Sequence, residues 1–96
     1  MGTADGFEKA MLELHTWWLQ HLQWNAKAFR SMVWQDGGVD AAIRLVEGDP
    51  RSAGYMRLLE AGRLDKSVEA LVVNEKWCEL FDESVLRRAR DRLRPG

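Results

Sequence analysis

A chain of 96 residues with an apolar fraction of 46% is long enough for one hydrophobic core and too short for two. A net charge of −1 excludes a strongly basic or acidic protein, and the single cysteine, Cys78, excludes an intramolecular disulfide. The N-terminus lacks the pattern of a secretory leader, and no apolar run approaches the roughly 20 residues that span a bilayer. We therefore expect a soluble, cytoplasmic protein with no membrane partner.

The first predicted helix follows Asp5, a suitable N-cap, and carries apolar residues spaced three or four positions apart. They are Phe7, Met11, Leu14, Trp18 and Leu22. Such spacing places side chains on one helix face. The pattern weakens at residues 23–25, and a second helix then carries Ala28 or Phe29, with Met32 and Val33, up to Gly37-Gly38. Residues 6–35 form either one bent helix or two, and two is the favoured interpretation.

Two further helices are predicted in the middle of the chain. The first covers Val39–Glu47 and ends at Gly48, with Pro50 two residues later. Ser52 can cap the next helix, and Gly62 would close it. Its expected inward residues are Tyr55, Leu58 and Leu59.

The segment from Leu64 to Phe81 is the densest apolar run, and we expect the other helices to pack around it. Its first helix would start at Asp65 or Ser67. The residues expected on its buried face are Val68, Leu71 and Val72. Asn74 would cap a second short helix, whose apolar residues are Trp77, Leu80 and Phe81.

The last predicted helix begins at Asp82. Its inward residues would be Val85, Leu86, Ala89 and Leu93, while its arginines mostly face water. No segment shows the alternating pattern of a strand. The sequence thus predicts an all-α protein, a single compact domain over residues 1–96 with six or seven short helices and frayed ends at 1–4 and 95–96.

Residues with catalytic or metal-binding chemistry are sparse. His15 and His21 lie six positions apart, which is not the spacing of a metal pair on a helix, and Cys78 lies in an apolar segment that favours an inert thiol. We expect no enzymatic activity, no cofactor and no metal.

Five tryptophans exceed what so small a core needs, and tryptophan is enriched where proteins bind one another. Trp17, Trp24 and Trp34 are the candidate protein-interaction residues. The favoured function is a protein-interaction module with a protein partner or a second copy of the chain, and the first two helices would form the homodimer interface.

A nucleic-acid partner is the alternative hypothesis. Residues 1–86 hold 9 basic and 14 acidic side chains, whereas residues 87–96 hold five arginines and one aspartate. The candidate contacts are Arg87, Arg88, Arg90, Arg92 and Arg94. The competing interpretation is that these arginines complement the dipole at a helix C-terminus. A loose helix-turn-helix pattern over Gly54–Val73 adds little support for DNA binding, because Asp65 and Glu69 on its second helix would repel DNA.

A further alternative to a protein or nucleic-acid partner is a small apolar or cationic ligand held between aromatic side chains.

Residues 29–93 resemble a group of short bacterial helical proteins. The likeness rests on the segments GGVDAAIRLV and SAGYMRLLEAGRLDKSVEALVVNEKWCELF. The resemblance implies no activity, and the tryptophan-rich first helix is the least typical part of the chain.

Overall fold

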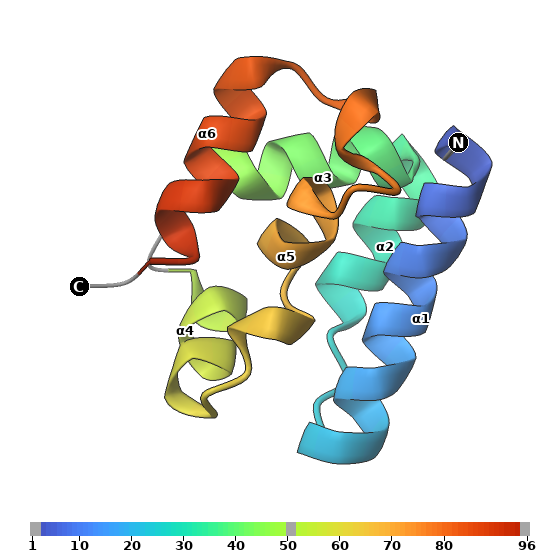
Figure 1. The fold of residues 1–96 in the computed structure, drawn as a ribbon. Coiled ribbons are helices and arrows are strands. Elements are labelled where there is room, and N and C mark those ends of the chain that lie inside the picture. The colour runs from blue at the N-terminus through green and yellow to red at the C-terminus, as the bar shows by residue number, and fades with distance from the viewer. Residues whose placement is uncertain (1–2, 50–51, 95–96) are drawn as a thin grey trace.

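The structure, a computed structural model, describes residues 3–49 and 52–94 and builds them from six α-helices joined by short turns (Figure 1). The α-helices are α1 (Ala4–Leu22), α2 (Lys27–Asp36), α3 (Gly38–Glu47), α4 (Ala53–Glu60), α5 (Val68–Val73) and α6 (Glu83–Arg92). Two 3-10 helices cover Leu64–Lys66 and Cys78–Leu80. These residues contain no strand, so the all-α prediction is confirmed, and residues 6–35 form two helices rather than one. Of the residues expected to be frayed, 1, 2, 95 and 96 lie outside the described residues. Residues 3 and 4 are not frayed, because Thr3 caps α1 and Ala4 is its first residue.

Side-chain caps begin four of the helices. The hydroxyl of Ser52 accepts the amide of Tyr55 at the start of α4, as the sequence predicts. One other predicted start differs, because Thr3 rather than Asp5 caps α1, and its hydroxyl accepts the amide of Gly6. Of the two starts predicted for α5, Asp65 and Ser67, the cap is Ser67, whose hydroxyl accepts the amide of Ala70.

Asp82 caps α6 as predicted, and its carboxylate accepts hydrogen bonds from the Ser84 hydroxyl and the Val85 amide. These bonds lower the pKa of Asp82 below its ordinary value of 3.8, with the Ser84 bond as the larger cause. Because the pKa of Asp82 is lower in the folded state, the cap contributes its full stabilisation at pH values above the unfolded-state pKa. Its contribution is lost as the pH falls through the lowered value.

The short helix α5 lies in the middle of the molecule (Figure 1). It contacts α6, α3 and α1, while α2 packs against both α1 and α3. Val68 and Val72 of α5 are buried, and Leu71 is half-buried against the same core. The central segment is therefore the interior element that its apolar pattern indicates.

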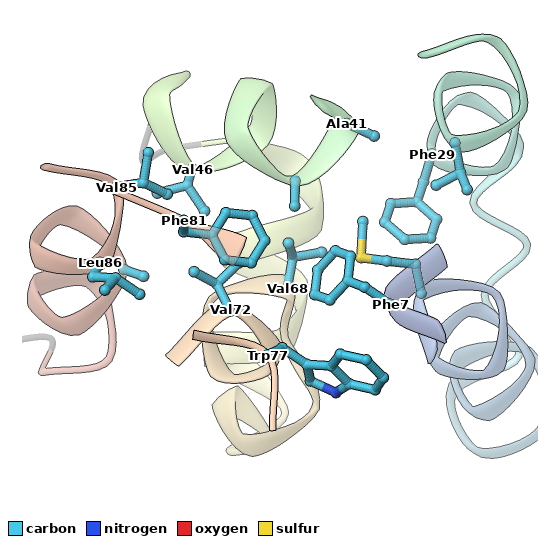
Figure 2. Close-up of a cluster of buried hydrophobic side chains, with 14 of the residues drawn as sticks. Phe7, Phe29, Ala41, Val46, Val68, Val72, Trp77, Phe81, Val85 and Leu86 are labelled. Atoms are coloured by element: carbon cyan, nitrogen blue, oxygen red, sulfur yellow. The ribbon is translucent and has the colours of Figure 1, made fainter. Parts of the chain in front are cut away.

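Aromatic side chains fill the core between α1 and the segment that follows α5 (Figure 2). Phe7 is fully buried, with its ring edge-on to Trp77 at 5.8 Å and to Phe81 at 5.1 Å between centroids. Trp77 and Phe81 are buried beside a 3-10 helix rather than on the α-helix that their spacing predicts. Asn74 accepts the amide of Lys76 and so forms a turn instead of a helix cap.

The two glycines between α2 and α3 have different roles. Gly37 has a φ of +86°, a conformation that other residues rarely adopt, and this sharp turn ends α2. A Cβ atom on Gly38 would lie 2.6 Å from the Cα of Glu8, and the Gly38 amide donates to the Glu8 carboxylate. The second glycine therefore allows α3 to begin directly against the backbone of α1.

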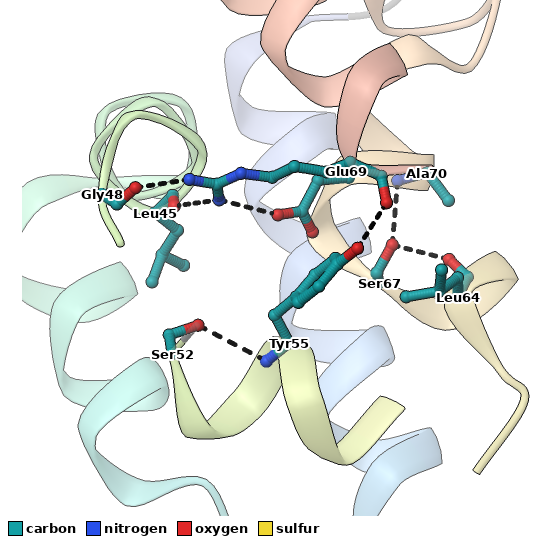
Figure 3. Close-up of polar contacts among 9 residues, drawn as sticks. Leu45, Gly48, Ser52, Tyr55, Leu64, Ser67, Glu69 and Ala70 are labelled. Carbon is teal, nitrogen blue, oxygen red and sulfur yellow. Dashed lines mark hydrogen bonds and ion pairs between the residues drawn. The ribbon is translucent and has the colours of Figure 1, made fainter. Parts of the chain in front are cut away.

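A buried ion pair joins three helices (Figure 3). The guanidinium of Arg92 lies 3.0 Å from the carboxylate of Glu69 on α5, and it also donates to the carbonyls of Leu45 and Gly48 at the end of α3. The backbone carbonyl of Arg92 accepts the hydroxyl of Tyr55 at 2.6 Å. Arg92 was expected to face water, and that expectation is wrong. Its long side chain reaches back from the end of α6 to satisfy the last carbonyls of α3.

Candidate functional site

A cavity of about 400 Å³ lies where the first turns of α2 and α4 meet α5 and the last part of α1. Its apolar walls are formed by Trp18, Trp24, Phe29, Met32, Leu45, Tyr55, Leu58 and Val68. They come from segments up to 50 residues apart in the sequence, so the cavity exists only in the folded chain. Small-molecule sites typically enclose about 300–1,000 Å³ and are mostly apolar, which places this cavity at the small end of that range.

Aromatic stacking holds one wall of the cavity in place. Trp18 stacks on Trp24 with 4.5 Å between ring centroids, and Phe29 meets Trp18 edge-on at 4.8 Å. The indole N–H of Trp18 donates to the carbonyl of Lys66 at 2.7 Å, which fixes the ring. Gly54 of α4 lies close to Trp24, so that a Cβ atom there would be 3.1 Å from its ring. These contacts preform the wall without a ligand.

The carboxylate in the cavity lining has an ion-pair partner, whereas two cations at the cavity have none among the described residues. Glu69 lines the cavity, but Arg92 neutralises its carboxylate. Lys27, also in the lining, is exposed and forms no ion pair with the described residues. Arg57 lies over the ring of Trp24 at 5.2 Å and likewise has no ion-pair partner among them. The net charge beside the cavity is therefore positive.

The three candidate tryptophans of the sequence lie in three different environments. Trp17 stacks on His21 at 4.4 Å, and the charged ends of Arg63 and Lys66 cover its ring. Trp24 forms part of the cavity wall. Trp34, on α2, is 72% exposed. The expected common contact face is thus divided, and Trp34 is its most accessible member.

The five candidate arginines are divided as well. Arg87, Arg88 and Arg94 are exposed and form no ion pair within the described part of the chain. Arg90 lies 3.2 Å from Glu83 on the same helix, and the Arg92 side chain, 10% exposed, is paired with Glu69. The basic surface near the C-terminus is smaller than the sequence indicates.

The predicted helix-turn-helix is absent in the form that the sequence suggested. A 3-10 helix separates α4 from α5, and α5 has six residues. Glu69, expected on an exposed reading face, is buried against Arg92. The second helix belongs to the core and presents no such face.

The histidines and the cysteine occupy separate places. His15 is buried, stacked beside Phe29 at 6.3 Å, and its Nε2 atom has no hydrogen-bond partner. His21 is exposed, and Cys78 is half-buried. Within residues 3–49 and 52–94, no three His, Cys, Asp or Glu side chains gather as a metal site would require.

Sequence reasoning suggested a pocket between aromatic side chains but assigned it no residues. The signal available was the crowding of Trp18, Trp24 and Phe29 around the break between the first two helices. The contribution of α4 carried no sequence signal, because it depends on how that helix docks.

Fold and cavity together define a small all-helical domain with an aromatic cavity beside its central helix. No helix among the described residues has both the length and the apolar character needed to cross a bilayer. Comparison with family models, with curated proteins and with solved structures finds no match for this chain. The resemblance to short bacterial helical proteins therefore stays a prediction.

Proposed function

We propose that this chain is a non-enzymatic binding domain that takes the apolar group of a small ligand into the cavity. The observation that carries the proposal is the preformed, mostly apolar cavity of about 400 Å³. Its aromatic wall is fixed by stacking and by the Trp18 hydrogen bond. A ligand would therefore bind with little ordering of the protein, and pre-organisation of this kind favours affinity.

The arrangement of cations argues against the cationic ligand that the sequence left open. Aromatic cages bind cations through exposed ring faces. In this chain the rings carry cations of their own: Arg57 lies over Trp24, and Arg63 and Lys66 lie over Trp17. An incoming cation would have to displace them, so the apolar group is the better match.

The test is calorimetric titration with 2-naphthylmethanol, a neutral aromatic probe with a ring system about as large as an indole. We expect measurable binding that Ala53→Leu weakens by about tenfold or more, because Ala53 belongs to the cavity lining and a larger side chain there takes up part of the cavity. Ala61→Leu, at the exposed end of the same helix and outside the lining, is the matched control and should bind as the parent does. Equal affinity for both variants would contradict the proposal.

The exposure of Trp34 favours a second candidate function, contact with another protein or a second copy of the chain. A side chain of this size that is 72% exposed is a plausible interface anchor. We expect sedimentation at rising concentration to show self-association that Trp34→Ala removes. Leu19→Ala, which changes a 45% exposed side chain on α1, serves as the control. A monomer at all concentrations would reject the homodimer.

A further inference from the structure

The cavity has a charge preference that its apolar walls do not explain. It is lined by the first turns of two helices, residues 25–29 at α2 and residues 52–55 at α4. The first amides of a helix lack intrahelical acceptors, and the macrodipole makes this end positive. Ser52 caps α4, but α2 has no side-chain cap and no acidic residue in its first turn. The cavity defines the site, and the helix ends contribute positive potential to it.

Lys27 is placed where it opposes local stability. It is the first residue of α2, and a cation at the N-terminus of a helix is repelled by the positive end of the helix dipole. It has no ion-pair partner among the described residues, and it lines the cavity. An exposed residue that conflicts with its local structure is typical of a functional position. A ligand with a negative group would give this lysine its missing partner.

The remaining charges agree with this reading. The one carboxylate in the lining, on Glu69, is held by Arg92 and leaves no free negative charge to repel an anion. Arg57, over the Trp24 ring in the cavity wall, adds a second cation without an ion-pair partner among the described residues. Apolar walls with positive charges beside them match an amphiphilic acid.

We infer that the ligand is a small apolar acid, with its aromatic or aliphatic body in the cavity and its carboxylate near Lys27. The inference rests on the proposed function and adds the ligand's charge to it. It assigns Lys27 a contact with the acid group and Arg57 a supporting electrostatic role.

The experiment compares three probes with one ring system: 2-naphthoate, 2-naphthylmethanol and 2-naphthylmethylammonium, each titrated calorimetrically into the full chain. We expect naphthoate to bind about fivefold more tightly than the alcohol, a value in the upper range for a solvent-exposed charge pair, and the ammonium probe to bind most weakly. Lys27→Gln should remove most of the naphthoate advantage and leave the alcohol unchanged. Its melting temperature should equal or exceed that of the parent, because an unfavourable helix charge is removed.

Arg87→Gln supplies the control, since it removes the same charge from an exposed position on α6 outside the lining. It should leave all three affinities unchanged. Equal binding of naphthoate and the alcohol, or a naphthoate affinity that Lys27→Gln does not change, would overturn the inference and leave the proposed function intact. If none of the three probes binds, both the inference and the proposed function are overturned.

Discussion

Replacing Arg92 by methionine is expected to lower the free energy of unfolding by about 3–5 kcal/mol, the usual cost of removing one partner from a buried ion pair. The side chains of Arg92 and Glu69 are 10% and 7% exposed, so the substitution leaves a carboxylate in the interior without its counter-charge. It also removes the donors that satisfy the carbonyls of Leu45 and Gly48. Urea denaturation followed by circular dichroism measures the change.

Two further variants separate this explanation from a simple loss of packing. Arg88→Met changes an exposed arginine of the same helix and should shift the unfolding free energy by less than about 0.5 kcal/mol. The double variant Arg92→Met, Glu69→Leu should recover much of the loss, because no unpaired charge is then buried. A double variant that is as unstable as the sum of its single changes would contradict the assignment.

Truncation of Phe7 to alanine should be comparably severe, at about 3–5 kcal/mol for a fully buried phenylalanine. Its ring contacts Trp77 and Phe81 edge-on, and together they join α1 to the segment after α5. The loss creates a void between two parts of the chain that are 70 residues apart, which the backbone cannot easily close. Thermal and denaturant unfolding report the effect.

Leu19→Ala provides the comparison on the same helix. Leu19 is 45% exposed, so its truncation should change stability by less than about 0.5 kcal/mol. Similar losses for the two variants would show that helix propensity, rather than burial of Phe7, determines the stability of α1.

The sequence predicted the helices well because most of them are amphipathic. The spacing of Phe7, Met11 and Trp18 places them on one face of α1, and the structure buries all three. Ser52 and Asp82 act as caps because their side chains reach amides three residues ahead, a local interaction that spacing reveals. At the start of α5 the sequence left Asp65 and Ser67 as alternatives, and at α1 it predicted Asp5 where Thr3 is the cap.

The features that the sequence did not predict depend on distant contacts. The arginine spacing in α6 is that of a solvated face, yet Arg92 is drawn inward by Glu69 and by the carbonyls at the end of α3. Helical periodicity carries no information about a partner 23 residues away. The cavity is similar, because Trp24, Tyr55 and Val68 meet only through the docking of α4.

The sequence also could not show which of the candidate tryptophans would be accessible to a partner. The excess of tryptophans made Trp34 a candidate interface residue, and its exposed fraction of 72% is consistent with that role without identifying a partner. Trp17 was a candidate on the same ground, but Arg63 and Lys66, from a segment more than 40 residues later, cover its ring. Residue type alone does not say which side chains another segment will cover.

The claim that the cavity beside α5 is the binding site is tested most directly by nuclear magnetic resonance. Each of the five tryptophans provides one indole N–H resonance, and each lies in a known environment. On titration with 2-naphthoate, we expect the indole signals of Trp18 and Trp24 to shift saturably, while those of Trp34 and Trp77 stay in place. Saturable shifts at Trp34 or Trp77 with none at Trp18 and Trp24 would place binding elsewhere and contradict the account.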